Sequence, residues 1–377
     1  MTLNRRAFLK TGALGSTAVL AGCDCAERCG EASIATASSS GIRSRELKMV
    51  TTWPKDFPGL GDAAKQTAQF ITEMSGGALR VKVYAANELV GAFDSFDAVS
   101  GGSADFYHGA EYYWTGKSRA YPFFTAVPFG MTAIEYMAWI EVGGGQELWD
   151  ELAASFNIKP LMAGNTGHQL GGWFKKEINT LDDLRGLKIR MPGIAGEVIR
   201  RSGAAAVNVP GGELYQALQS GAIDATEWVG PWNDIAFGFY REAKYYYWPG
   251  FHEPGAQLSL GTNLDVWNDM TVQEKSIIQN AARASNHLNL ANYAARNGRA
   301  LKVLLEEHNV ELREMPEVIL QELAKNTSVV LDEIAQTDDL SKRIYDSYRT
   351  SLKEASDWNR ISDEAYLKAR RTLLDLG

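Results

Sequence analysis

Cysteine is nearly absent from this chain of 377 residues: its three copies, Cys23, Cys25 and Cys29, all lie near the N-terminus. Their C-x-C-x3-C spacing lacks the nearby histidine or fourth cysteine that a zinc or iron–sulfur site needs. A thiolate metal or redox cluster is therefore disfavoured. The long remainder of the chain has no cysteine for catalysis or for a disulfide.

Positive charge is also scarce. The formal net charge is −8, and no basic run is longer than a short pair. Because nucleic-acid-binding surfaces need a basic patch or stripe, we exclude nucleic acid as a partner. With 45% hydrophobic and 22% charged residues, the composition is that of an ordinary globular protein. The length favours two lobes over a single core.

Common catalytic motifs are missing. There is no H-E-x-x-H, no P-loop and no G-x-S-x-G, and the five histidines are scattered. His168, beside Gln169, is the best candidate for a general base. A periplasmic hydrolase that uses His168 and Glu227 is kept as an alternative, but we expect a protein that is not an enzyme.

The N-terminus has the pattern of an export signal over residues 1–22. Residues 5–10, Arg-Arg-Ala-Phe-Leu-Lys, resemble the twin-arginine motif, and a short apolar stretch follows. Residues 20–23 resemble a bacterial lipobox, in which Cys23 would carry a lipid. The small residues within 23–45 predict a tether. The sequence therefore indicates a periplasmic protein with a possible lipid anchor at Cys23.

After the tether, strand and helix patterns alternate. Residues 46–54 and 78–86 have the apolar pattern of strands, and 62–74 between them is typical of a helix. This order predicts an α/β fold of two lobes with mostly parallel sheets, whose ligand cleft lies between the lobes at the carboxyl ends of strands. The expected boundaries are lobe I at 46–168 with a return segment at about 258–310, and lobe II at 169–257.

A short pattern occurs twice and supports two similar lobes. Residues 98–106 align with 217–225: in each, a helix ends near a glycine, and an aspartate three residues later opens a strand. Common helix-stop chemistry is the simpler explanation. If the lobes are similar, residues 107–109 correspond to 226–228, and both would face the cleft. Glu227 would then point toward a ligand.

A further unit places an arginine at a strand end. Thr180 with Asp183 predicts a capped short helix, Gly186 can end it, and Leu187–Met191 predicts a strand. Arg190 would therefore lie at the carboxyl edge of that strand, where its planar guanidinium suits a bidentate grip on a carboxylate. A solvated surface charge is the alternative.

Two stretches carry a family resemblance: "GLKIRMPGIAGEVIRRSGAAAVNVPGGELYQALQSGAIDATEWVGP" and "AKYYYWPGFHEPG". They resemble the substrate-binding protein of tripartite ATP-independent periplasmic (TRAP) transporters, and most of all the branch that captures 2-oxo and 2-hydroxy monocarboxylates such as pyruvate and lactate. The resemblance implies a two-lobed periplasmic binding protein that delivers its ligand to the small and large membrane subunits. A ligand domain that signals to a sensor is the alternative.

The resemblance also implies the site. Arg190 would bind the ligand's carboxylate, and a metal ion would bridge ligand and protein. Four residues would hold the ion, the last through its backbone carbonyl: Gln169, Glu227, Glu253 and Trp228. Gln169, Glu253 and Trp228 would also contact the ligand. We expect calcium, with sodium as the alternative, because two carboxylates among hard oxygen ligands favour a divalent ion. An ordinary ion pair between Glu227 and a basic side chain is the competing interpretation.

Aromatic residues are expected to wall a small pocket for a short apolar tail, with Trp173, Trp228 and Trp232 serving in both core and pocket. Tyr113 and Asn208 are further candidate ligand contacts. Asn208 is alternatively a turn residue.

Residues 311–377 have apolar residues at helical spacing and hardly any strand pattern. Packing across the back of both lobes would explain these helices. In the branch that the chain resembles, a long terminal helix is exchanged between subunits, so a homodimer is expected.

Overall fold

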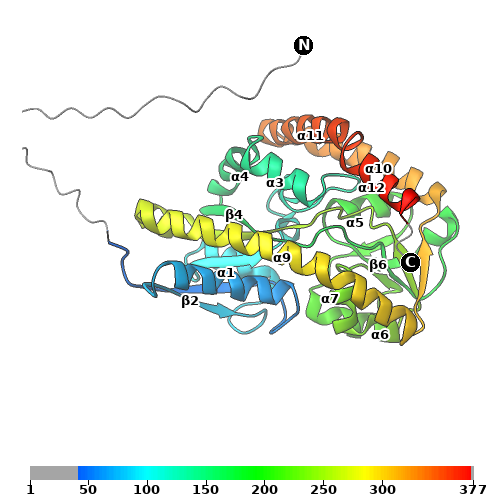
Figure 1. Ribbon diagram of the computed structural model, residues 1–377, viewed down its shortest axis with the longest axis horizontal. Helices are drawn as coiled ribbons and strands as arrows, with labels where there is room; N and C mark the ends of the chain where they lie inside the picture. The colour runs from blue at the N-terminus through cyan, green and yellow to red at the C-terminus, as the bar shows by residue number, and fades with distance from the viewer. Residues whose placement is uncertain (1–40, 375–377) are drawn as a thin grey trace, which may run out of the picture. The chain divides into compact units, whose positions relative to one another are not determined.

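The computed structural model describes residues 41–374 (Figure 1). The export signal, the lipobox with Cys23 and most of the tether lie outside the described residues. Within the described range, no helix is both long and apolar enough to cross a membrane.

Five strands form the first sheet: β1 (Arg45–Thr51), β2 (Leu79–Tyr84), β3 (Phe106–Gly109), β4 (Ile158–Asn165) and β10 (Gln257–Asn263). Their order is β2-β1-β3-β10-β4. β1 pairs in parallel with β2 and β3, whereas β10 lies antiparallel between β3 and β4. All residues of β10 are buried, as expected for a central strand.

Six strands form the second sheet: β5 (Gly172–Phe174), β6 (Lys188–Arg190), β7 (Ala205–Val207), β8 (Ala225–Thr226), β9 (Tyr245–Trp248) and β11 (Glu311–Glu314). Their order is β11-β9-β5-β8-β6-β7. β5 is antiparallel to both its neighbours, and the other pairs are parallel. The region after residue 310 was expected to be helical throughout. Instead it begins with β11, whose register with β9 extends the edge of this sheet.

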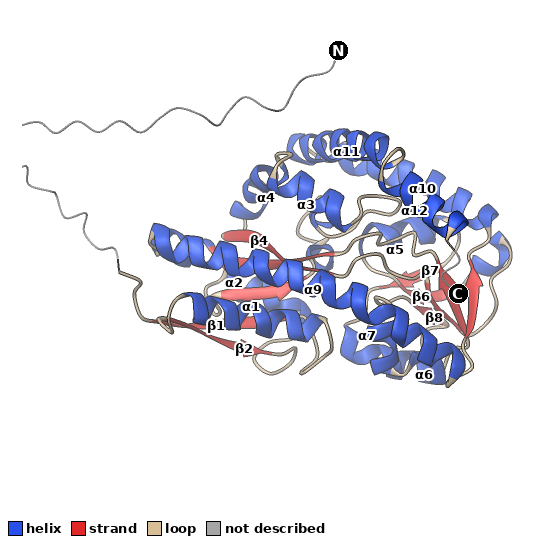
Figure 2. Ribbon diagram, viewed as in Figure 1, coloured by secondary structure: helices blue, strands red, loops and turns tan. Residues whose placement is uncertain are grey.

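Helices flank both sheets (Figure 2), with these bounds: α1 (Leu60–Met74), α2 (Ser95–Ser100), α3 (Ala133–Glu141), α4 (Gly145–Ala154), α5 (Gly193–Arg201), α6 (Leu214–Ser220), α7 (Pro231–Phe237), α8 (Leu264–Asp269), α9 (Val272–Glu306), α10 (Glu317–Ala335), α11 (Asp339–Asn359) and α12 (Asp363–Leu373). The 35-residue α9 packs on β4 and α1, and further along on α7. The return segment therefore supports both sheets. The helix expected at 62–74 is confirmed as α1.

The repeated sequence pattern is also repeated in structure. Asp105 accepts the backbone N–H of Lys48 in the neighbouring parallel strand at 2.7 Å, and Asp224 accepts that of Lys188 at 3.1 Å. The glycine three residues before each aspartate has a left-handed φ, +78° and +75°. Helix-stop chemistry alone does not require this shared strand contact, so the two sheets contain equivalent units.

Candidate functional site

Arg190 and Glu227 meet where two parallel strands end. Arg190 is the last residue of β6 and lies in register with Thr226, the last residue of β8. Glu227 follows directly, and its backbone N–H donates to the Arg190 carbonyl at 3.3 Å. Both side chains are fully buried. The expected placement of Arg190 at a carboxyl strand edge is confirmed.

Arg190 forms an ion pair with Glu227 through Oε1. Its other nitrogens donate to the Val209 carbonyl at 3.2 Å and to the Tyr113 hydroxyl at 3.4 Å, and its guanidinium carbon lies 5.0 Å from the centre of the Trp228 ring. Burial alone would lower the pKa of Arg190, but the surrounding acidic groups, Glu227 foremost, raise it. The guanidinium therefore stays charged inside the protein.

Two of the three connections between the sheets, from β4 to β5 and from β9 to β10, run alongside each other at this point. Gln169 N donates to the Glu253 carbonyl, Gly250 N to the Gln169 carbonyl, and Thr166 N to the Ala256 carbonyl, each at 3.1 Å. The side chains of Gln169 and Glu253 are joined as well, Nε2 to Oε2, at 2.8 Å. Two of the residues expected to bind a metal, Gln169 and Glu253, thus lie on segments that link the two sheets.

Glu227, His252 and Glu253 form a buried cluster whose candidate ligand atoms lie within 4.8 Å of one another. His252 Nε2 is 3.3 Å from Glu227 Oε2, outside hydrogen-bonding geometry. Within the described chain, neither that oxygen nor Gln169 Oε1 has a hydrogen-bond partner. Burial, and then the charge of Glu227, raise the pKa of Glu253 well above its usual range. These two buried hard oxygens without donors, one from a carboxylate and one from an amide, lie beside the second buried carboxylate of Glu253 and fit a calcium or sodium ion.

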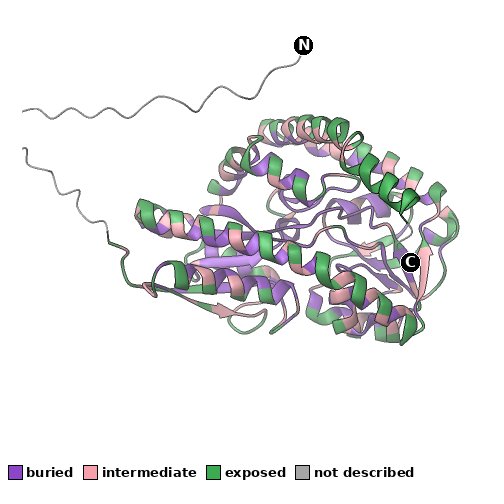
Figure 3. Cartoon of the chain, in the orientation of Figure 1, coloured by how far each residue is buried: buried purple, intermediate pink, exposed green. Residues whose placement is uncertain are grey.

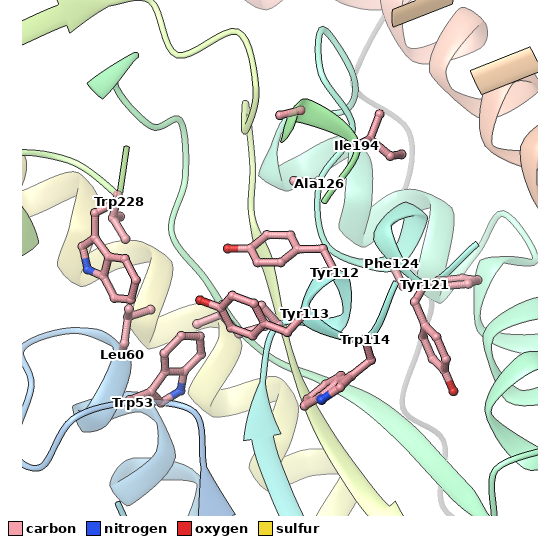
Figure 4. Packing of buried hydrophobic residues seen from close by; sticks show 14 of the residues in the cluster. Trp53, Leu60, Tyr112, Tyr113, Trp114, Tyr121, Phe124, Ala126, Ile194 and Trp228 are labelled. Atoms are coloured by element: carbon pink, nitrogen blue, oxygen red, sulfur yellow. The ribbon is translucent and has the colours of Figure 1, made fainter. Parts of the chain in front are cut away.

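A cavity of about 10 Å³, the space of about one water molecule, lies next to this cluster. Figure 4 shows Trp53, Leu60 and Trp228 close together, with the hydroxyls of Tyr112 and Tyr113 directed toward them. The full lining is Trp53, Leu60, Tyr112, Tyr113, Thr166, Gln169, Trp228, Val229, Ala256 and Leu258. The lining combines an apolar wall with a few polar groups, which is the chemistry of a small-molecule site, in a space that as it stands holds about one water molecule.

Most of the expected site residues come together: Gln169, Arg190, Glu227, Trp228, Glu253 and Tyr113. The expectation for Asn208 is not supported, because its side chain is exposed in the segment after β7. His168 is exposed as well, while Glu227 is fully buried against Arg190.

Two of the tryptophans expected at the pocket do not line it. Trp173 is buried, stacks on Tyr246 at 4.0 Å and donates to Asp234, so it belongs to the core. Trp232 packs edge-on against Tyr293 on α9. Only Trp228 of the three lines the cavity.

Sequence reasoning missed Trp53, Tyr112 and His252. Trp53 lies just beyond the end of β1 at Thr51, and the rule that ligands bind beyond strand ends could have identified it. His252 is adjacent to Glu253 in the stretch that carries the resemblance, but a lone histidine gives no signal of its own.

Comparisons with known proteins identify the family of the chain. The model of the family described as bacterial extracellular solute-binding protein, family 7 (DctP) matches residues 49–338. The monocarboxylate 2-oxoacid-binding periplasmic protein of Nostoc sp. (strain PCC 7120) is 37% identical over 364 residues, which is 97% of this chain and 98% of that protein.

Two crystal structures of TRAP solute-binding proteins are also similar. The one from Pseudoalteromonas atlantica, with bound sodium and pyruvate, is 38% identical with a TM-score of 0.84, and the match covers 87% of this chain and 99% of that chain. The one from Bordetella bronchiseptica, a dimer with calcium and picolinate bound, is 30% identical with a TM-score of 0.86 and covers 88% and 98%. The chain therefore belongs to family 7 of the bacterial extracellular solute-binding proteins, as a periplasmic TRAP binding protein and not an enzyme.

Proposed function

We propose that this protein captures a small 2-oxo or 2-hydroxy monocarboxylate, such as pyruvate or lactate, in the periplasm and delivers it to the small and large membrane subunits of a TRAP transporter. The observation that carries the proposal is the buried Arg190 at a strand end, paired with Glu227, which in turn lies in a buried cluster with Glu253 and its partner Gln169. The 2-oxoacid-binding relative and the pyruvate-bound structure support the ligand class.

Arginine and cation would bind different oxygens of the ligand. The planar guanidinium of Arg190 would hold the ligand's carboxylate through two hydrogen bonds. Gln169, Glu227, Glu253 and the carbonyl of Trp228 would hold the cation, which supplies positive charge to the ligand's 2-oxo or 2-hydroxy oxygen. Calcium is preferred over sodium because two buried carboxylates leave less uncompensated charge beside a divalent ion. The solved relatives, one with sodium and one with calcium, support both as alternatives.

Titration calorimetry in calcium-containing buffer tests the ligand class with a matched pair, pyruvate and propionate. Both have three carbons and one carboxylate, but only pyruvate has a 2-oxo oxygen that can bind the cation together with a carboxylate oxygen. We expect pyruvate to bind at least about tenfold more tightly, a difference of about 1.4 kcal/mol. Equal affinities, or no binding of pyruvate or lactate, would contradict the proposed function.

Export and anchoring are proposed from the sequence alone. A twin-arginine-like signal at residues 1–22 would direct export, and lipid at Cys23 would hold the protein at the membrane near the transporter's membrane subunits. Both proposals concern residues outside the described part of the chain.

We also propose a homodimer formed through α12. No residue of α12 is buried, and Tyr366, Leu367 and Leu373 are 63%, 48% and 79% exposed, as the predominantly exposed ribbon of this helix in Figure 3 illustrates. An apolar groove of about 490 Å³ between α3 and α11 exposes Ile134 and Trp358. The α12 helix of a second copy would cover this groove, and the dimeric relative supports this arrangement.

A further inference from the structure

Asp234 on α7 is a buried carboxylate with all its hydrogen-bonding capacity in use. It is 1% exposed. Its Oδ2 accepts from Trp173 Nε1 at 2.9 Å and from the Tyr246 hydroxyl at 2.7 Å. Its Oδ1 accepts from the backbone N–H groups of Val229 at 3.2 Å and Gly230 at 3.1 Å. An ionised carboxylate can accept about four hydrogen bonds, so each acceptor site is matched to a donor.

The two oxygens connect different parts of the protein. Trp173 lies on β5 and Tyr246 on β9, so Oδ2 is fixed to the middle of the second sheet. Oδ1 binds the loop that immediately follows Glu227 and Trp228. The carbonyl of Val229 in turn accepts from Leu170 N at 3.1 Å, next to Gln169.

The helix that carries Asp234 is fixed as well. The neighbouring Asn233 is fully buried, donates to the Pro58 carbonyl at 2.9 Å and accepts from the Tyr293 hydroxyl at 2.8 Å. Pro58 precedes α1 and Tyr293 lies on α9, which Figure 1 shows passing over α7. The helix that carries Asp234 is therefore held by α9 and by the segment before α1, while its carboxylate is held by two strands of the sheet.

A simple helix-start role does not explain these contacts. An acidic residue in the first turn of a helix is favourable because of the helix dipole, and Asp234 is in the first turn of α7. Such a role needs no burial and no donors from two strands of a sheet. The contacts instead join the sheet to a loop, and that loop bears two of the proposed cation ligands.

We propose that Asp234 is a positioning residue for the cation site: it holds the loop at 227–230 so that the Glu227 carboxylate and the Trp228 carbonyl are set for the ion before it binds. The inference rests on the proposed function. Without this anchor the loop would have to be ordered at the moment of binding, which costs affinity.

The main variant is Asp234→Asn, which keeps the shape but places an amide NH2 group against N–H donors. Glu274→Gln is the matched control: Glu274 is also a buried carboxylate that accepts two backbone N–H groups, from Arg43 and Thr271, each at 2.8 Å. It lies at the start of α9, outside the candidate site. Calcium and pyruvate are the probes, titrated by calorimetry into chelator-treated protein.

We expect Asp234→Asn to weaken calcium-dependent pyruvate binding at least about tenfold, or about 1.4 kcal/mol. The control Glu274→Gln should stay within about twofold of the wild type. Because Asp234 would act through the cation ligands, Asp234→Asn should add less than about twofold to a Glu227→Gln variant. A purely structural role would lower the unfolding temperature without this dependence on Glu227.

Each outcome separates the two proposals. Wild-type protein that binds neither probe would overturn the proposed function and this inference with it. Wild-type protein that binds both, with Asp234→Asn unchanged or fully additive to Glu227→Gln, would overturn the inference alone. If Asp234→Asn does not fold, Tyr246→Phe removes one of the four donors. We expect it to weaken binding about threefold, and no change would overturn the inference.

Discussion

The ion pair of Arg190 with Glu227 determines how a ligand can enter the site. The pair is fully buried, and removing one partner of such a pair costs about 3–5 kcal/mol. An anionic ligand on Arg190 alone would leave the negative charge of Glu227 without a partner. A cation on Glu227 alone would leave the positive charge of Arg190 without one. Ligand and cation together compensate both charges. We therefore expect them to bind cooperatively.

Glu111 gives a pH prediction away from the ligand. It is fully buried, it accepts from the Tyr107 hydroxyl at 2.7 Å, and burial raises its pKa from 4.5 to about 7. Because the folded state favours the protonated form, this group stabilises the fold most below about pH 4.5, and that contribution is lost as pH rises toward 7.

The neutral variant Glu111→Gln cannot ionise at this position, so its stability should not fall for this reason as the pH rises. Relative to it, the free energy of unfolding of the wild type should fall by up to about 3 kcal/mol between pH 4.5 and 8. Denaturant unfolding at four pH values measures the difference, and the comparison cancels groups common to both proteins. Parallel profiles for the two proteins would show that folding does not raise the pKa of Glu111.

Single residues were predictable where a local pattern placed them. Arg190 followed from a short strand before Pro-Gly, and Glu227 from the repeat. Gln169 and Glu253 came from the family resemblance alone. Trp53 and His252 were missed, and Trp173 was misplaced, because their neighbours are distant in the sequence. Burial of Trp173 beside Tyr246 depends on strand order, which no local pattern contains.

At the scale of elements, the repeat predicted equivalent units in the two sheets, and the matching contacts of Asp105 and Asp224 confirm them. The antiparallel positions of β5 and β10 were not predictable. The alternation of strands and helices along the sequence does not show which remote strands pair, or in which direction. The same holds for β11, a four-residue edge strand that follows a 35-residue helix.

The exposed helix α12 provides a test of the dimer. Ending the chain at Ser362 should convert a dimer into a monomer in light scattering, since the apolar side of α12 would no longer cover the groove of a second copy. Pyruvate affinity should stay within about twofold, because α12 contributes no site residue.

A point-variant comparison tests the same interface without truncation. Leu367→Ser with Leu373→Ser should weaken the dimer, and the exposed neighbour Lys368→Ser should not. A monomeric wild type, or a truncated chain that is still dimeric, would rule out this role for α12.

For the molecule as a whole, the binding site and the links between its two sheets coincide. Gln169 and Glu253 lie on the β4–β5 and β9–β10 connections, and α9 packs on both halves. A cation held by these residues would therefore tie the two connections together. Cation binding and the relative position of the sheets should consequently depend on each other.

The most direct test is whether cation and ligand affinities are linked. Pyruvate is titrated into protein that has been exhaustively chelated in sodium-free buffer, and again after calcium is restored. We expect calcium to tighten pyruvate binding at least about 100-fold, about 2.7 kcal/mol, and pyruvate to tighten calcium binding by the same factor. Glu227→Gln should remove most of this coupling. Full pyruvate affinity without any cation, or an unaffected Glu227→Gln variant, would contradict the cation bridge and leave Glu227 as an ordinary ion-pair partner of Arg190.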